Sequence, residues 1–384
     1  MRLAIIRQRY TPYGGAERFI ESALEALLER NVAISLYTRE WPETNLQLME
    51  PQIVDPFYVG RLWRDVGFAH AVARRLRKSD ADVVQSHERL PSCDVFRAGD
   101  GVHAVWLEER AKAQGPIARF VSAAQPYHRY LLWMERRLFA SPTLAAVICN
   151  SQMVRDEIKL KFGVSDDKLH VVHNAVDCDV FSPALRAHRP AVRARHAIAN
   201  DAIVFLLVGS GYERKGASTA IDALRELPRA HLIVVGRETH LSRYVRRAQE
   251  RGVADRVTFA GPQQDPKPYF GAADAFVLPT LYDPLPNAAL EAMACALPIV
   301  TSTKSGAAEL AIGADAGFVC PSCDSAALAA HMLALHDDDL RARMGDNARR
   351  AMMPLSPAAM TLKLVLLYKD LLQARVAVRA SVRR

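Results

Sequence analysis

The stretch that decides the fold runs from residue 278 to residue 296 and reads Leu-Pro-Thr-Leu-Tyr-Asp-Pro-Leu-Pro-Asn-Ala-Ala-Leu-Glu-Ala-Met-Ala-Cys-Ala. The apolar run Ala275–Leu278 is typical of a buried strand, and Asn287–Cys295 is a run of strong helix formers that begins with a good capping residue. Two carboxylates, Asp283 and Glu291, stand eight positions apart across this junction. We expect Asp283 on the loop at the carboxyl end of the strand and Glu291 one turn inside the helix.

The start of this helix is expected to bind an anion. Backbone amides around Asn287 and Ala288 have no acceptor within the helix, and the positive end of the helix dipole lies behind them. Such a helix start favours a phosphate. The flanking carboxylates, Asp283 and Glu291, can accept hydrogen bonds from hydroxyl groups. Phosphate together with a polyol indicates a nucleotide sugar.

Further out, strands and helices alternate in two series, and 384 residues exceed the comfortable size of one core. We predict an α/β fold with two Rossmann-like doubly wound domains, residues 1–180 and 181–356, separated near the irregular segment 181–200. A last helix begins at Ser356-Pro357 and runs to about Arg375. The strands are expected at Arg2–Ile6, Val32–Tyr37, Asp82–Gln85, Ala145–Cys149, Ile203–Val208, His231–Val235, Val257–Phe259, Ala275–Leu278 and Ile299–Thr301, with helices at Ala16–Arg30 and Ala217–Leu227.

Two glycine loops follow the first strand of each series. Gly14 and Gly15 allow positive φ and a close backbone approach just before a helix. The second loop, residues 208–216, contains Arg214 and Lys215 before another helix, so two cations and helix amides are expected to converge on a diphosphate. Fixed positive charge there would stabilise a departing nucleoside diphosphate without a protein acid. Turn glycines and a surface Arg-Lys pair are the simpler alternatives.

Together these motifs resemble the retaining glycosyltransferases of the GT-B fold, the large family that includes sucrose, mannosyl and lipopolysaccharide-core transferases. The resemblance implies two domains facing across a cleft, residues 1–180 binding the acceptor and residues 181–356 binding the nucleotide-sugar donor. It places Asp283 at the donor sugar and Glu291 at the ribose. It also implies that Gly14-Gly15 closes over the donor phosphates and that the last helix, about 357–384, packs back on the N-terminal domain. The chain departs from the family pattern with Asp283 where Glu is usual and Ser210 where Arg is frequent.

Shorter strings resemble the lipopolysaccharide-core glucosyltransferase branch of that family. They are Tyr10-x-Pro-x-Gly-Gly15, Leu90-Pro-x-x-Asp94, Ala98-Gly-Asp100 and Gly209-Ser-x-x-x-Arg-Lys-Gly216. By this resemblance Asp100 is expected to be catalytic, with Asp283, Arg214 and Lys215. The donor-binding set is Gly14, Gly15, Ser210, Asn287, Ala288 and Glu291. His87 and His103 are candidates for the cleft or for ordinary hydrogen-bonded positions at its edge.

The composition of the chain excludes several classes of protein. The net charge of +8 is too small and dispersed to indicate nucleic acid binding, and the first residues lack the long apolar run of a signal peptide. The six scattered cysteines indicate reduced thiols in a cytosolic protein; Cys320-Pro-Ser-Cys323 has no second pair to complete a zinc site. Asp177-Cys-Asp179 resembles the family's connector between domains, so we expect no metal and no cofactor beyond the donor substrate.

Residues 110–137 combine arginines and aromatic side chains with Glu135 as an opposing acid. Such a segment favours an anionic membrane surface, and a solvated face above a core helix explains it equally well. The expected protein is a cytoplasmic, peripheral inner-membrane hexosyltransferase that moves glucose from UDP-glucose to a lipopolysaccharide-core or related glycolipid acceptor. A nucleotide-sugar epimerase on the same fold and a non-catalytic nucleotide-sugar-binding protein are the alternatives.

Overall fold

The computed structural model describes residues 1–9, 32–41, 50–115 and 124–382. Its contacts divide the chain into two compact units. Unit 1 comprises Met1–Asn174 with Pro357–Arg384, and unit 2 comprises Ala175–Ser356. The division falls after Asn174, whereas the sequence placed it after Val180. The expected helix at residues 16–30 lies outside the described residues, as do Gly14 and Gly15.

Within its described residues, unit 1 is built on a seven-stranded parallel sheet in the order β3-β2-β1-β4-β5-β6-β7. The order reverses between β1 and β4, which pair directly from Leu3 with Val83 to Ile6 with Ser86. The strands are β1 Arg2–Ile6, β2 Ala33–Thr38, β3 Glu50–Ile53, β4 Val83–Ser86, β5 Val95–Arg97, β6 Ala146–Cys149 and β7 Leu169–Val171.

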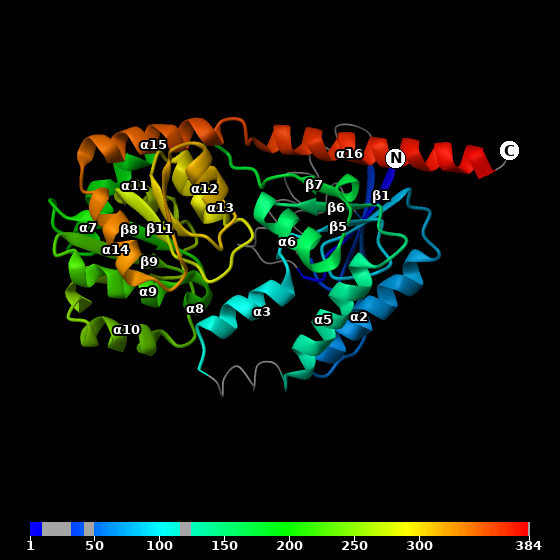
Figure 1. Cartoon of the computed structure of the whole chain (residues 1–384), viewed down its shortest axis with the longest axis horizontal. Coiled ribbons are helices and arrows are strands. Elements are labelled where there is room, and N and C mark those ends of the chain that lie inside the picture. The colour runs from blue at the N-terminus through cyan, green and yellow to red at the C-terminus, as the bar shows by residue number, and fades with distance from the viewer. Residues whose placement is uncertain (10–31, 42–49, 116–123, 383–384) are drawn as a thin grey trace. The chain divides into compact units, whose positions relative to one another are not determined.

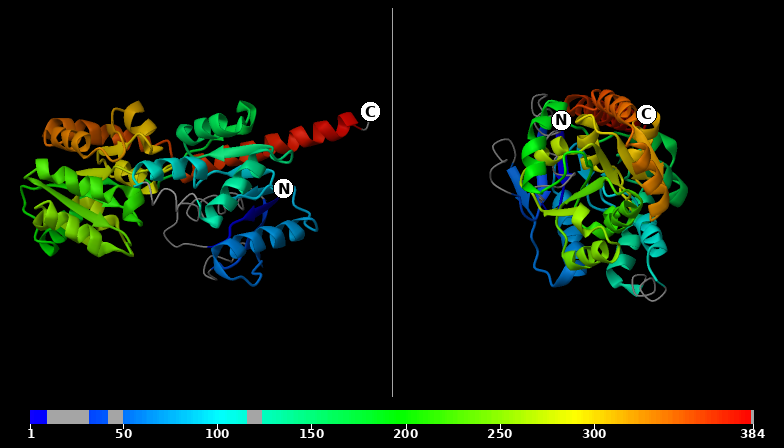
Figure 2. Two further views of the ribbon diagram at one scale, coloured as in Figure 1. Left: turned by 60° about the horizontal axis from the view of Figure 1, so that its bottom comes forward. Right: turned by 90° about the vertical axis from the view of Figure 1, so that its left-hand side faces the viewer.

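Helices cover this sheet, and α2 packs against α5 over a cluster that includes Phe68, Val72 and Met134. The helices are α2 Gly60–Leu76, α3 His103–Lys112, α5 Pro126–Phe139 and α6 Gln152–Phe162, with the 3-10 turn η2 Asp166–Lys168. The last helix, α16 Pro357–Val382, is a single long helix that carries the C-terminus (Figure 2) and extends past the expected end at Arg375. It joins unit 1, where the Tyr368 hydroxyl donates to Gln85 Oε1 at 2.5 Å.

Unit 2 is built on a six-stranded parallel sheet in the order β10-β9-β8-β11-β12-β13. Strands β8 and β11 are apolar and almost wholly buried, which places them at the centre of the core. Helices α9, α10 and α14 pack on one face, and α11, α12 and α15 lie on the other (Figure 1). The strands are β8 Ile203–Val208, β9 Ala230–Val235, β10 Val257–Gly261, β11 Ala275–Leu278, β12 Ile299–Ser302 and β13 Gly317–Cys320.

The helices of unit 2 alternate with these strands along the chain, as expected for a parallel sheet. They are η3 Pro183–His188, α7 Arg189–Arg195, α8 Tyr212–Lys215, α9 Ala217–Ala223, η4 Leu224–Glu226, α10 Leu241–Glu250, η5 Ala254–Arg256, α11 Lys267–Ala272, α12 Asn287–Ala294, α13 Ala307–Gly313, α14 Ser325–Ala334 and α15 Asp338–Met352. The expected fold class, two Rossmann-like parallel-sheet domains, is confirmed by these two units.

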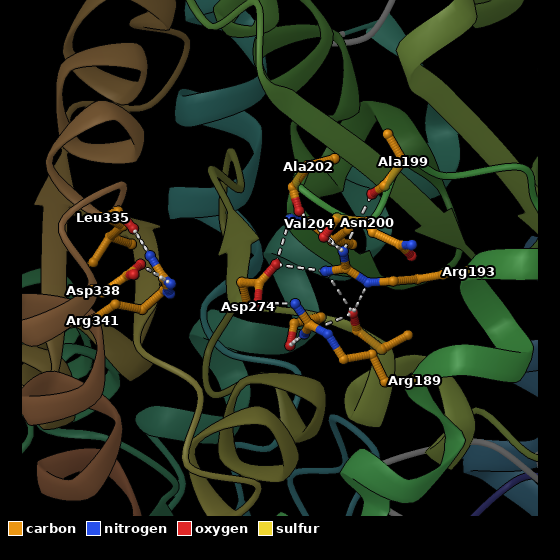
Figure 3. A network of polar contacts seen from close by, with 12 residues as sticks. Arg189, Arg193, Ala199, Asn200, Ala202, Val204, Asp274, Leu335, Asp338 and Arg341 are labelled. Carbon is orange, nitrogen blue, oxygen red and sulfur yellow. Dashed lines mark hydrogen bonds and ion pairs between the residues drawn. The ribbon is translucent and has the colours of Figure 1, made fainter.

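The prediction of an irregular segment at residues 181–200 is wrong, because most of this segment is helical. Arg189 and Arg193 of α7 both form ion pairs at 2.7 Å with the buried carboxylate of Asp274, which precedes β11 (Figure 3). Arg193 also donates to the backbone carbonyls of Asn200 and Ala202. These contacts hold α7 against the sheet, and a local periodicity test cannot see partners so far along the chain.

Among the described residues no single helix is both long and apolar enough to cross a membrane. One bent pair, Asp338–Met352 with Pro357–Ala374, meets that test by length and composition only.

Candidate active site

The loop between β11 and α12 holds Asp283 in a fixed position. The Asp283 amide donates to the Lys304 carbonyl at 2.9 Å, and the Gly306 amide donates to the Asp283 carbonyl at 2.9 Å. Asp283 thereby pairs with Ser305 as an isolated parallel bridge beyond the ends of β11 and β12. Its side chain is buried at the carboxyl end of the sheet, where ligands of parallel α/β folds bind.

Two cations from the loop after β8 converge on this carboxylate. Lys215 Nζ lies 2.5 Å from Asp283 Oδ2, and Arg214 Nη1 lies 3.3 Å from the same oxygen. Lys215 is buried, whereas 41% of the Arg214 side chain is exposed. The sequence predicted that these three residues serve one site, and the structure brings them into direct contact.

Backbone contacts fix the cations on the sheet. Gly216, at φ +74°, follows Lys215, and a Cβ there would overlap the carbonyl of Pro279 at the end of β11. The Arg214 carbonyl accepts from the Leu281 amide at 2.8 Å and from the Thr280 hydroxyl at 2.6 Å. The loops after β8 and β11 are therefore joined into one rigid edge that carries both cations and the carboxylate.

The charges in this cluster perturb each other's protonation. Burial opposes ionisation of Asp283, but the neighbouring Lys215 and Arg214 lower its pKa below the ordinary value. Burial also lowers the pKa of Lys215, against the opposing effect of Asp283. With all three groups ionised, two cations and one anion leave a charge of +1 at the carboxyl end of the sheet. Such a site attracts a polyanion such as a diphosphate.

Glu291 lies one turn inside α12 and is buried, as expected from the sequence. The predicted cap is wrong: Pro286 occupies the N-cap position in an extended conformation, and Asn287 is the first helical residue, followed by Ala288. Pro286 has no polar side-chain atom, so the N-cap residue itself cannot accept from the first-turn amides.

Ser210 ties its loop to the end of β9. The Ser210 hydroxyl accepts from the Arg237 amide at 3.2 Å, and the Gly211 amide donates to the Arg237 carbonyl at 3.1 Å. A Cβ at Gly236 would overlap the Gly209 carbonyl, so the loops after β8 and β9 approach backbone to backbone. Sequence reasoning missed Gly236, although a glycine directly after an apolar strand is a signal for such an approach.

The remaining candidates lie in unit 1. Asp100, with 65% of its side chain exposed, follows β5, and its Oδ2 lies 3.9 Å from Arg7 Nη1. Its loop is held by Arg89, which donates to the Gly101 carbonyl at 3.1 Å and to Glu135 at 3.1 Å. Glu135 also accepts from the first amides of α3, so the single acid of the basic segment is a buried helix cap that the sequence did not reveal.

Both histidine candidates are buried. His103 begins α3, its Nε2 lies 3.2 Å from His128 Nδ1, and burial together with Arg89 and His128 lowers its pKa to about 3. Burial, with Arg97 and Arg7, lowers the pKa of His87 well below its ordinary value. Since Gln85 accepts from Tyr368, its amide Nε2 donates to neutral His87 at 3.0 Å. Both rings are therefore neutral and enclosed.

The basic segment 110–137 forms the end of α3 and most of α5, with Arg119 and Phe120 outside the described residues. Arg129, Arg136 and Arg137 are exposed, and Arg137 lies over the Trp133 ring at 4.8 Å. A second feature was not predicted from the sequence: α2 exposes Leu62, Trp63 and Val66, whereas Phe68 and Val72 of the same helix are buried.

No group of three or more potential metal-binding side chains occurs in the part of the chain that the structure describes. The Asp-x-Asp sequence closes a turn, since Asp177 Oδ1 accepts from the amides of Asp179 at 2.9 Å and Val180 at 3.1 Å. All six cysteines are free thiols, and Cys320 is buried whereas Cys323 is exposed.

Comparison with known proteins identifies the family to which a site of this kind belongs. Residues 188–351 match the family model of group 1 glycosyl transferases, and residues 13–180 match that of glycosyltransferase family 4. The lipopolysaccharide core biosynthesis glycosyltransferase LpsE of Rhizobium meliloti (strain 1021) is 30% identical over 300 residues, 76% of this chain and 77% of that protein. The chain belongs to the group 1 glycosyltransferases.

The matches to other relatives extend over nearly the whole of this chain. The lipopolysaccharide glucosyltransferase WaaG of Escherichia coli (strain K12) is 24% identical over 357 residues, 91% of this chain and 93% of that protein. A crystal structure of WaaG superposes with a TM-score of 0.80 at 22% identity, covering 94% and 98% of the two chains. Anabaena HepE, solved with UDP and glucose, gives 0.72 at 19% identity, covering 96% and 99%. These structures share the GT-B fold, and the enzyme is a hexosyltransferase that uses a nucleotide sugar.

Proposed function

We propose that this enzyme is a retaining glucosyltransferase that moves glucose from UDP-glucose to a lipopolysaccharide-core or related glycolipid acceptor. The observation that carries the proposal is the cluster of Asp283, Lys215 and Arg214 at the carboxyl ends of β8 and β11. These strands are neighbours at the point where the order of the sheet reverses, the usual ligand position in doubly wound folds. The names of LpsE, WaaG and the HepE complex favour the acceptor class and the donor.

In the proposed reaction the bond between the sugar C1 and the diphosphate oxygen breaks while an acceptor oxygen bonds to C1 on the same face. The acceptor proton passes to the departing diphosphate, so the products are UDP and the new glycoside. Lys215 and Arg214 stabilise the charge that grows on the diphosphate, Asp283 orients the sugar hydroxyls, and Glu291 holds the ribose. Charge stabilisation of this kind is worth roughly 2–4 kcal/mol for each preorganised group.

Positive charge from the protein itself removes the need for a metal in this mechanism. We therefore place the enzyme among metal-independent transferases, and EDTA is expected to leave its turnover unchanged. The donor loop Gly14-Gly15 and the residue Asp100 complete the proposed site, with Ser210, Asn287 and Ala288 on the donor side.

The deciding experiment measures nucleotide release from UDP-glucose, UDP-galactose, GDP-mannose and ADP-glucose, with and without a glycolipid acceptor from lipopolysaccharide core. Acceptor-dependent release of UDP from UDP-glucose, with an α-linked product by NMR, supports the proposal. Conversion of the sugar without any acceptor indicates an epimerase, and donor binding without nucleotide release indicates a binding protein. Either result contradicts transfer.

We further propose that unit 1 binds the cytoplasmic surface of the inner membrane. Exposed apolar side chains on α2, with Trp63 53% exposed, and the exposed arginines of α5 support this. Each cation near an anionic surface contributes about 1 kcal/mol, and salt screens that attraction within about 10 Å. Interfacial tryptophan adds an apolar anchor.

The membrane proposal is tested by co-sedimentation with vesicles of phosphatidylglycerol and phosphatidylethanolamine. Neutralising Arg129, Arg136 and Arg137 together, or changing Trp63→Ala, should release the protein, and high salt should mimic the triple variant. Leu160→Ala, an exposed apolar residue of α6 in the same unit, is the matched control. Unchanged vesicle binding in the triple variant, with a lower melting temperature, would mean that the arginine stems cover the unit's own apolar surface.

A further inference from the structure

Unit 2 has a pocket among its helices, away from the Asp283 cluster. It is lined by residues of α9, η4 and α14 and by Arg251 after α10, and its volume is about 420 Å³ (Figure 1). Leu227 precedes β9 and Arg251 precedes β10, so this part of the lining lies toward the amino end of the sheet. The donor edge, with Asp283, lies at the opposite end.

One wall of the pocket is an apolar side of α14. Ala326, Ala330 and Leu333 line it, and Leu333 is 56% exposed. The buried side chains of Leu227 and Ala329 belong to the same lining. An exposed leucine beside an apolar hollow provides both a projecting group and the space to receive one, which is how complementary interfaces pack.

The charged groups of the pocket are of two kinds. The carboxylate of Asp222 accepts from Arg247 Nε and from Arg251 Nε, both at 2.9 Å, so these residues pair with each other. Arg225 and Glu226 are adjacent in η4 and exposed, and within the described residues neither forms an ion pair or a side-chain hydrogen bond. One cation and one anion therefore stand side by side without a partner.

This charge pattern disfavours most occupants. A phosphate, a nucleic acid or an anionic membrane would bring negative charge against Glu226, and a basic segment would meet Arg225. A second copy of the chain supplies both charges in the opposite order, because a two-fold axis sets the same surface patch against itself.

The topology places the exposed leucine beside these charges. Helix α9 follows β8 and α14 follows β13 of the parallel sheet, so both helices begin at its carboxyl end and run toward its amino end. The turn η4 continues α9 to Glu226, and Leu333 is the last residue but one of α14. Leu333, Arg225 and Glu226 therefore share one end of the pocket and can all lie close to a single two-fold axis.

We propose that unit 2 forms a symmetric dimer with a second copy of this chain through the pocket. Arg225 of each copy pairs with Glu226 of the other, and Leu333 of each copy enters the pocket of the other. The dimer does not depend on the identity of the donor or of the acceptor.

The first test is sedimentation velocity of the full chain from about 1 to 100 μM, the range over which a micromolar dimer changes population. At the upper concentrations the parent should sediment with twice the 42.5 kDa of one chain. Leu333→Asp would bury an unpaired charge in the interface and should leave the protein monomeric throughout. Ile312→Asp, at an exposed apolar residue of α13 in the same unit, is the matched control and should dimerise as the parent does.

The second test exchanges the charges. Arg225→Glu sets acids against acids across the axis, and Glu226→Arg sets bases against bases, so each variant alone should dimerise about tenfold more weakly than the parent, or worse. An equal mixture of the two variants should recover the dimer, because every acid then faces a base. Arg195→Glu, at an exposed arginine of α7, is the matched control and should dimerise normally.

Three results would overturn the proposal. They are a parent protein that stays monomeric over the whole range, a Leu333→Asp variant that dimerises as the parent does, and a mixture no more dimeric than its separate components. Recovery in the mixture also shows that both charge variants are folded, and a melting curve shows the same for Leu333→Asp.

Discussion

Two buried aspartates stand at opposite ends of strand β11, and each is paired with two cations. Asp274, just before the strand, binds Arg189 and Arg193 at 2.7 Å (Figure 3). Asp283, beyond the other end, binds Lys215 at 2.5 Å and Arg214 at 3.3 Å. By chemistry and burial the two clusters are nearly the same. Only their position on the sheet separates them.

At the amino end of β11 Asp274 and Arg193 are buried, and Arg189 is 30% exposed. Asp274 also accepts from the Val204 amide at 2.8 Å, and Arg193 donates to several backbone carbonyls as well as to the carboxylate. At the carboxyl end, Arg214 stays 41% exposed beside the start of α12. The comparison teaches that a buried ion pair with a part-exposed cation is a candidate site when it lies at the ligand-binding edge of the sheet, whereas a similar pair at the opposite edge is structural.

The largest effect is expected at the structural cluster. Arg193→Ala leaves Asp274 buried with one partner fewer, and breaking a buried pair in this way costs about 3–5 kcal/mol of unfolding free energy. Urea unfolding measures the loss. At a temperature where the variant remains folded, kcat/KM for transfer should equal that of the parent. A large fall in kcat/KM would show that the two clusters do not differ in role.

The next effect is expected at the Asp283 cluster, which we propose to be catalytic. Lys215→Ala removes one preorganised charge from the departing diphosphate and should cost about 2–4 kcal/mol of transition-state stabilisation, or roughly 30- to 1,000-fold in kcat/KM. Lys267→Ala, a part-exposed lysine of α11, is the control and should leave turnover unchanged. Turnover of Lys215→Ala close to that of the parent would remove Lys215 from the mechanism.

The sequence brought together the residues of the Asp283 cluster but not those of the Asp274 cluster. Glycines, a helix start and two carboxylates at fixed spacing mark the edge at Asp283, because those features serve a ligand and recur as a local pattern. Asp274 carries no such mark: its partner Arg193 lies 81 positions away, in a segment that the sequence assigned to an irregular connection. Strands β8 and β11 were predicted with the bounds that the structure gives, since a continuous apolar run is a local signal.

Contacts between residues far apart in the sequence also explain which features of unit 1 could not be predicted. In unit 1 one pocket is lined by Arg7 after β1, Asp65 of α2 and Tyr127 of α5, and Glu135 caps a helix that begins 32 positions earlier. None of these pairs has a short spacing. Asn287 fails as a cap for a different reason, since Pro286 takes the extended N-cap position before it.

A third prediction separates the two carboxylates of the donor site. Glu291→Gln should weaken UDP binding by about 1.5–3 kcal/mol, the usual worth of a hydrogen bond to a charged group, because the variant loses the charged acceptor for a ribose hydroxyl. Asp283→Asn should impair transfer more than UDP binding, because it also releases Lys215 and Arg214 toward the diphosphate. Calorimetry with UDP decides the question: a larger loss of UDP affinity in Asp283→Asn than in Glu291→Gln would reverse the assigned roles.

The smallest effect is expected from mild acid, which should lower stability while sparing the Asp283 cluster. His103 has a folded pKa of about 3 against an ordinary value of 6.5, so the unfolded chain binds its proton first and stability falls as pH drops below 6.5. One pH unit below that value costs about 1.4 kcal/mol for this group. The pKa of Asp283 is instead lowered from 3.8, so the stability from its ion pairs persists above that value and is lost only as pH falls through the lower folded pKa. Urea unfolding between pH 7 and 5.5 should therefore show this loss of stability. The substitution His103→Gln should reduce the loss, whereas His70→Gln, at an exposed histidine of α2, should not. UDP affinity should barely change over the same range. A fall in UDP affinity that parallels the loss of stability would mean that the Asp283 cluster responds to the same protonation, and that its charges are less firmly held than those around Asp274.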